Sequence, residues 1–179
     1  MKKILSLMAL FLVMGFGAYS TASADVGPLT CFDGPSDSSI YGGDCTITAG
    51  VTTLDNSGGD TDGSYSGVYY PDDSLRGILL SDIDALSFDY TGTATAGSPR
   101  ISLPVDTNND GVAEFYAFIG AFYCNDGAGN VDPLTDATCT IWVGGTSYAD
   151  WNTFVAAYPG AEVADAATFI IADDAGSWT

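Results

Sequence analysis

The sequence predicts an all-β fold, an antiparallel, jelly-roll-like β-sandwich with one short amphipathic helix. Short runs with apolar residues at every second position recur over residues 64–179, as at Leu86, Phe88 and Tyr90. This period of two is typical of half-buried strands. Turns rich in Asp, Gly and Pro separate the runs, and only one segment has helical spacing. Several short strands at such spacing favour a sandwich.

The first 24 residues have the pattern of a secretory signal peptide. Lys2 and Lys3 precede an apolar run over residues 4–18, and the small residues 22–24 follow it. We expect cleavage before Asp25. The alternative, a membrane anchor, is disfavoured because an apolar core of about 15 residues is shorter than a spanning helix requires. The predicted product is a secreted protein, extracellular or periplasmic, with no membrane insertion after cleavage.

Residues 25–63 form the next predicted part, a segment rich in Gly, Ser and Asp that is clipped by a disulfide and joins the sandwich of residues 64–179. The four cysteines of an exported chain are expected to form disulfides. Three pairings are possible, and we favour the two local ones, Cys31 with Cys45 and Cys124 with Cys139. Each disulfide would close a loop of about 15 residues and stabilise the fold by about 3 kcal/mol. A zinc site is disfavoured, since the chain has no histidine.

The predicted strands follow the alternating runs. In the segment 25–63 only residues 46–54 have strand character, and the later strands are expected within residues 84–92, 100–106, 112–124, 139–145 and 167–174. Ile101, Leu103 and Val105 should point inward from the second of these. Pro104 lacks an amide donor, which predicts an edge position or a bulge there. Gly120 is expected to interrupt the 112–124 strand.

One segment predicts a helix that lies across the sandwich. Ser147 stands three residues before Asp150, as in a capping box, and Pro159 with Gly160 marks the end. Trp151, Phe154, Val155 and Tyr158 recur at helical spacing. An apolar stripe of this kind normally faces the core, so we assign these aromatics to packing and not to ligand binding.

Charge and composition exclude several functions. After the leader the chain carries 23 acids against two arginines, Arg76 and Arg100, a net charge of −21. Such a surface repels nucleic acid and anionic lipid and favours cations. Without histidine, and without lysine after the leader, a Ser-His-Asp triad and a Schiff-base lysine are unavailable. No catalytic residue is assigned, and we predict that the protein is not an enzyme.

The stretch "VDTNNDGVAEFY" predicts a structural Ca²⁺ site. Asp106, Asn108, Asp110 and Glu114 would bind by their side chains and Val112 by its backbone oxygen, in the pattern D-x-N-x-D-G-x-x-E. Calcium prefers six to eight such hard oxygens. The loop is not an EF-hand, because position 12 is not a glutamate. The pattern resembles the β-hairpin calcium loops of integrin-type propeller repeats and of bacterial surface domains. A plain hairpin turn made by "NNDG" is the alternative.

A weaker candidate is a carbohydrate-binding patch. Exposed aromatic rings can stack on sugars, and acids or amides can bind sugar hydroxyls. The segment 64–77 offers a set of such residues close together in sequence: Tyr65, Tyr69, Tyr70, Asp72, Asp73 and Arg76. The alternative is an ordinary strand and turn in which alternate tyrosines are buried. A carboxylate-dependent glycoside hydrolase is a third hypothesis, because paired acids are the only catalytic groups available.

Over residues 64–179 the order of "LSFDYTG", "VDTNNDGVAEF", "SYADWNTFVAAYP" and "TFIIADDAGSWT" resembles secreted bacterial concanavalin-like and carbohydrate-binding-module-like β-sandwich domains. The resemblance implies a bacterial surface or extracellular-matrix protein stabilised by calcium, with a lectin-like module as the alternative. Such domains generally continue past "GSWT" with a final strand. We therefore expect either a truncated chain or an open sheet edge that neighbouring copies fill. The expected partners are glycans or these neighbouring copies.

Overall fold

The computed structural model describes residues 29–34, 43–56, 65–70, 75–95, 97–124, 129–173 and 176–179. The predicted signal peptide and two acids of the predicted sugar patch, Asp72 and Asp73, lie outside the described residues. The described part is mostly strand, all of it paired antiparallel, with one short α-helix. The predicted fold class, an all-β sandwich with one helix, is confirmed.

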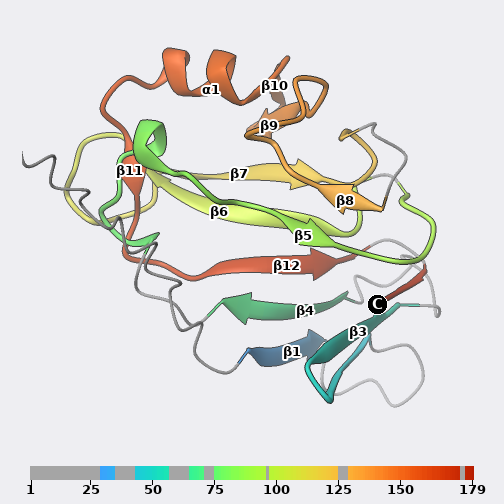
Figure 1. The fold of residues 1–179 in the computed structure, drawn as a ribbon. Coiled ribbons are helices and arrows are strands. Elements are labelled where there is room, and N and C mark those ends of the chain that lie inside the picture. The colour runs from blue at the N-terminus through green and yellow to red at the C-terminus, as the bar shows by residue number, and fades with distance from the viewer. Residues whose placement is uncertain are drawn as a thin grey trace, which may run out of the picture.

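One large sheet forms the first layer (Figure 1). Its strand order differs from the chain order, because the late strand β12 lies between β4 and β6. Across the sheet the strands are β1 (Thr30–Gly34), β4 (Tyr65–Tyr70), β12 (Thr168–Ala172), β6 (Arg100–Asp106), β7 (Phe115–Gly120), β9 (Ile141–Val143) and β10 (Thr146–Tyr148), and β11 (Glu162–Val163) also pairs with β6.

Two small sheets form the second layer. One contains β2 (Asp44–Thr48), β3 (Val51–Asp55) and β13 (Ser177–Trp178), and the other contains β5 (Phe88–Asp89) and β8 (Asn130–Val131). Figure 1 shows β3 and β5 in front of the large sheet. Thr91 and Thr179 exchange two backbone hydrogen bonds, N to O at 2.6 and 3.2 Å, and so connect the two small sheets.

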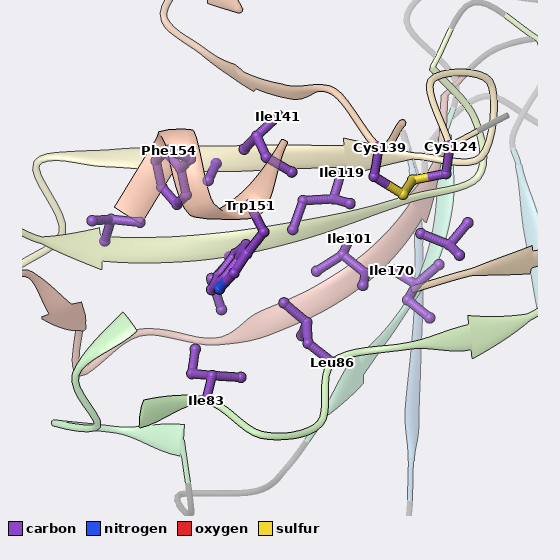
Figure 2. Close-up of a cluster of buried hydrophobic side chains, with 14 of the residues drawn as sticks. Ile83, Leu86, Ile101, Ile119, Cys124, Cys139, Ile141, Trp151, Phe154 and Ile170 are labelled. Atoms are coloured by element: carbon purple, nitrogen blue, oxygen red, sulfur yellow. A yellow bond between two sulfur atoms is a disulfide. The ribbon is translucent and has the colours of Figure 1, made fainter. Parts of the chain in front are cut away.

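The core lies between these layers. Ile101, Leu103 and Val105 point into it from β6, as their alternation predicts, and each is at most 1% exposed. Figure 2 shows side chains from the sheet, from the segment that precedes β5 and from the helix meeting in this cluster. Full burial of each such aliphatic side chain contributes about 1.5–3 kcal/mol. These side chains therefore hold the large sheet against the elements that cover its inner face.

Pro104 is not at a sheet edge, and that prediction is wrong. Strand β6 is internal and pairs regularly with β7 through Pro104 itself, which lies opposite Tyr116. On its other side β6 pairs first with β12 and then with β11, and Pro104 falls between the two stretches. Its carbonyl accepts a hydrogen bond from Ala164 at 3.1 Å. A missing donor at this break removes no ladder hydrogen bond.

The single strand predicted over residues 46–54 is a hairpin. Strands β2 and β3 pair antiparallel, with Thr48 opposite Val51. Ala49 and Gly50 form the two-residue turn, with φ angles of 53° and 82°. Positive φ at both turn positions is the geometry that matches the twist of paired strands. Alanine is uncommon at such a position, so the turn could not be predicted from the sequence.

The helix α1 spans Trp151–Ala157 and covers one end of the sheet (Figure 1). Its N-cap is Asp150, whose Oδ1 accepts a hydrogen bond from the Thr153 amide at 2.7 Å. The predicted capping box is therefore wrong, because Ser147 belongs to strand β10. The prediction that its aromatics pack inward is confirmed for Trp151 and Phe154, which are buried.

The two local disulfides are present, Cys31–Cys45 and Cys124–Cys139. The first joins β1 of the large sheet to β2 of the second layer, and the second borders the core (Figure 2). Disulfides persist in oxidising compartments such as the periplasm and the extracellular space. None of the helices described here has the length and apolar character needed to cross a membrane.

Candidate functional site

The candidate metal site is the loop that joins β6 to β7. The two strands are paired and central in the sheet, so the loop starts and ends on a rigid support. Asn109 and Gly111 adopt left-handed φ angles of 62° and 86°. Asparagine and glycine are the residues that tolerate this region best. The local sequence therefore folds the chain back on itself within a few residues.

Asp106, the last residue of β6, organises this loop. Its Oδ1 accepts hydrogen bonds from the backbone amides of Asn108 at 3.0 Å and Asn109 at 2.6 Å, and its Oδ2 accepts one from Gly111 at 2.6 Å. The side chain is only 2% exposed. Burial raises the pKa of Asp106, but the amides of Gly111, Asn108, Asn109 and Asp110 outweigh it and hold the pKa below its ordinary value. The carboxylate is thus charged and fixed in orientation.

Glu114 closes the loop from the other strand. Its Oε2 accepts hydrogen bonds from the Thr107 amide at 2.6 Å and the Thr107 hydroxyl at 3.1 Å, while its Oε1 accepts one from the Asn108 side-chain amide at 2.6 Å. Asp110 Oδ1 accepts a hydrogen bond from the Val112 amide at 2.9 Å. Both Asp110 and Glu114 are exposed, so a solvated cation has access to them.

The loop brings three carboxylates together. Oxygen atoms of Asp106, Asp110 and Glu114 all lie within 4.8 Å of one another. Three negative charges at this separation repel each other, and a divalent cation between them would remove that repulsion. Each carboxylate oxygen has two lone pairs. Asp106 Oδ2 and Glu114 Oε1 each accept one hydrogen bond, so each keeps a lone pair that can coordinate a cation. Three of the five predicted ligands therefore lie close together, and the other two, Asn108 and Val112, belong to the same loop.

A shallow cavity of ≈ 390 Å³ lies beside the loop. Asp106 and Gly111 line one side, and Glu162, Asp165 and Arg76 line the other. Arg76 forms an ion pair with Asp165 at 2.5 Å. Arg76 therefore belongs to the surroundings of the acidic loop and not to a patch with the tyrosines.

The described tyrosines of the predicted sugar patch do not share one face of the sheet. Tyr65 and Tyr69 lie on the outer face of the large sheet, with 37% of each exposed. Tyr70 points to the opposite face, because successive side chains of a strand alternate, and it packs against the core. The three tyrosines of β4 therefore cannot contact one ligand together.

The outer face carries an arrangement that sequence reasoning missed. Five residues, one from each neighbouring strand, stand side by side in the register of the sheet: Tyr69, Phe169, Ser102, Phe118 and Trp142. We call them the outer-face row. At a spacing of about 4.8 Å per strand the row is about 19 Å long. Of the four aromatic members, Tyr69 is exposed, and Phe118, Trp142 and Phe169 are half-buried.

Phe32 extends the outer-face row at the β1 side. Its ring centroid lies 4.3 Å from that of Tyr69 and 5.6 Å from that of Phe169. The ring lies across Gly67, where a Cβ atom would come within 2.2 Å of it. Glycine at this position is therefore needed for the close approach of the ring to the strand.

At the other end the row borders a small cavity of ≈ 180 Å³ between Arg100, Phe118, Tyr123 and Trp142. The Arg100 guanidinium lies 5.1 Å from the centroid of the Phe118 ring and is paired with Asp173. Among the buried polar atoms of the described residues, Trp142 Nε1 and Ser102 Oγ have no hydrogen-bond partner. Buried polar atoms are usually paired, so these two atoms are exceptions in the described part of the chain.

Comparison of the chain with protein-family models, with curated proteins and with solved structures found no match. The resemblance to concanavalin-like and carbohydrate-binding-module-like domains therefore stays a prediction that rests on the order of four sequence segments.

Proposed function

We propose that the protein is a secreted, non-enzymatic β-sandwich that binds one structural Ca²⁺ in its β6–β7 loop and serves as a surface or extracellular-matrix component. The observation that carries the proposal is the group of three carboxylates, Asp106, Asp110 and Glu114, whose oxygens lie within 4.8 Å of one another. The two disulfides support an oxidising location. The net charge of −21 after the leader supports a cation as partner.

Hydrogen bonds within the loop favour a site that is ordered before the ion arrives. Asp106 and Glu114 are both held by loop amides, so little ordering remains to oppose binding. The ion would attract all three carboxylates, which without it repel one another. Its role would be structural, since it would join the ends of two central strands.

Isothermal titration calorimetry tests this proposal. Calcium is titrated into chelator-treated protein in about 0.15 M NaCl, where diffuse charge attraction is screened beyond about 8 Å. We expect one site with a dissociation constant of about 10⁻⁴–10⁻³ M, the range of extracellular calcium modules. Asp110→Asn should weaken it at least tenfold, whereas Asp84→Asn, an exposed acid outside the cluster, should bind as the wild type does. Equal binding by both variants would show that the site is wrong.

A second candidate function is binding of a neutral polysaccharide to the outer-face row. Four aromatic rings in register on one open face offer surfaces on which sugar rings can stack. The Arg100–Asp173 pair, which is partly exposed, can bind hydroxyl groups at one end. A polysaccharide without negative charge suits a protein of this acidity.

Retention on insoluble neutral polysaccharides tests the second candidate. Trp142→Ala and Tyr69→Ala should each lower the affinity for the polysaccharide about tenfold, which is about 1.4 kcal/mol of binding free energy. Each variant should therefore be retained less than the wild type. Ile47→Ala, an exposed apolar residue of the second layer, is the matched control. Absence of retention on every glycan would remove this candidate, and hydrolysis of a glycan by the purified protein would instead support the third prediction, a carboxylate glycosidase.

A further inference from the structure

The outer face of the large sheet has a hollow beside the outer-face row. Strand β7 places Phe118 in the row and Gly120 two residues further along the same face, because side chains alternate. In the register of the sheet Gly120 lies opposite Arg100 of β6. Glycine contributes no side chain at this position, and the Gly97 carbonyl would lie only 2.9 Å from a Cβ atom there. The resulting cavity of ≈ 180 Å³ is called the Gly120 cavity below.

Aromatic rings line the Gly120 cavity on two sides. Phe118 and Trp142 lie opposite each other in the register of β7 and β9, and both belong to the outer-face row. Tyr123 comes from the turn that follows β7, and its ring centroid lies 5.5 Å from that of Trp142. The cavity is therefore lined by rings on the side of the row and again at the end of the strands, where Gly97 also borders it.

The turn that carries Tyr123 is held in place by two contacts. The Tyr123 carbonyl accepts a hydrogen bond from the Thr140 amide at 3.2 Å. The next residue, Cys124, is disulfide-bonded to Cys139, which lies two residues before β9 (Figure 2). Both contacts fix the turn against the start of β9. A wall that is ordered in advance leaves little conformational entropy to lose when a ligand binds.

The size and polarity of the Gly120 cavity fit one sugar ring. An apolar cavity of about 150 Å³ holds a benzene ring, so ≈ 180 Å³ admits one six-membered ring and not two. Arg100 lines the cavity and binds both carboxylate oxygens of Asp173 through its two Nη atoms. The two side chains are 19% and 37% exposed, and together they are electrically neutral. Aromatic walls can contact the apolar face of a sugar ring, and this polar pair can hydrogen-bond its hydroxyl groups.

We propose that the Gly120 cavity binds the terminal sugar of a neutral glycan whose following units lie along the outer-face row. The inference rests on the second candidate function and adds to it a specificity for chain ends. The cavity lies two residues from the row along β7, about 7 Å, so a glycan chain must leave the line of the row to enter it. Tyr123 and Gly97 then border the cavity at the end of the strands. The sugar in the cavity is therefore the last unit of its chain.

The stoichiometry of binding to glycans of graded length tests the inference. The probes are short, medium and long fractions of four soluble neutral polysaccharides, namely dextran, pullulan, galactomannan and mixed-linkage β-glucan, titrated into the purified protein in a calorimeter. We expect one protein bound per chain and the same dissociation constant at every length, because each chain has one end of a given kind. A stoichiometry that rises in proportion to chain length would overturn the inference and leave the second candidate function standing. Absence of binding to every fraction would reject both.

Two neighbouring aromatic residues provide matched variants. Tyr123→Ala removes a wall of the cavity, so it should lower the affinity about tenfold and let the stoichiometry rise with chain length. Phe122→Ala removes a ring that is 55% exposed and lies outside the cavity lining, so it should bind as the wild type does. Far-UV circular dichroism checks that both variants are folded, and the wild-type stoichiometry depends on neither. Unchanged affinity and one protein per chain in folded Tyr123→Ala would show that the cavity does not hold the chain end.

Discussion

Removal of calcium should lower the thermal stability of the protein. The number of ligands in the loop limits the size of this effect. The β6–β7 loop offers four side chains, Asp106, Asn108, Asp110 and Glu114, and one backbone oxygen, that of Val112. Five protein ligands are fewer than the six to eight that calcium takes, so water must complete the shell. We therefore place the affinity at the weak end of calcium sites, about 10⁻⁴–10⁻³ M, the range of extracellular modules.

This affinity fixes the expected shift. A ligand that binds only the folded state stabilises it by RT ln(1 + [L]/Kd), which is about 1.4–2.7 kcal/mol at about 10 mM calcium. For a domain of 150–250 residues each kcal/mol shifts Tm by about 2–4 °C. The midpoint in about 10 mM calcium should therefore lie about 3–11 °C above the midpoint in chelator.

Differential scanning calorimetry measures this shift. The Tm should rise with the logarithm of calcium concentration above Kd, because the stabilisation follows mass action. Asp110→Asn should abolish the dependence on calcium, and Asp84→Asn should retain it. An unchanged Tm between 10 mM calcium and chelator in the wild type would refute the reasoning, since the loop would then be held by its internal hydrogen bonds alone.

Three further predictions concern the fold. Phe154→Ala should cost about 3–5 kcal/mol of unfolding free energy in denaturant titration, because the side chain is fully buried and truncation leaves a cavity; a loss below about 1 kcal/mol would contradict its place in the core. Asp173→Asn should cost about 1–2 kcal/mol at pH 7, between exposed and buried ion pairs. Burial raises the pKa of Asp173, but Arg100 and the Ser98 hydroxyl outweigh it and lower the pKa overall. A carboxyl group whose pKa is lower in the folded than in the unfolded protein stabilises the fold at pH values above the unfolded pKa, and this stabilisation is lost as the pH falls. The difference in unfolding free energy between Asp173→Asn and wild type should therefore shrink below about pH 4. A constant difference from pH 7 to pH 2 would argue against the pair. Ala49→Asn should raise the unfolding free energy by about 0.5–1 kcal/mol, because Ala49 has a φ of 53° in a turn that prefers Asn-Gly; a destabilised variant would show that the turn has another geometry.

The local features of the fold could be predicted from sequence because each depends on residues close along the chain. The inward positions of Ile101, Leu103 and Val105 follow from a period of two, and the helix at Trp151 follows from a period near four. Errors arose where two local signals compete. Serine is a residue type favoured at helix N-caps, but Ser147 pairs in β10, and the N-cap of the helix is Asp150.

Among the candidate sites, too, the local one could be predicted from sequence and the one built from distant strands could not. The ligand set of the β6–β7 loop spans only residues 106–114, so sequence spacing alone brings its acids near one another. The tyrosines of the predicted patch around β4 do not act together, because alternation sends Tyr69 and Tyr70 to opposite faces. The outer-face row could not be predicted, since its members come from five strands whose register is set by long-range pairing.

The sequence by itself determined five of the strands, β5, β6, β7, β9 and β12, together with the helix, the acidic turn and the two short-range disulfides. The free energy of each is decided within a few residues or a short loop. Only the tertiary structure decided which strands are neighbours. The insertion of β12 between β4 and β6 brings Phe169 beside Tyr69, and the approach of Thr179 to Thr91 joins the two small sheets. Those pairings depend on how apolar faces from distant segments share one core, a choice that no single stretch of sequence contains.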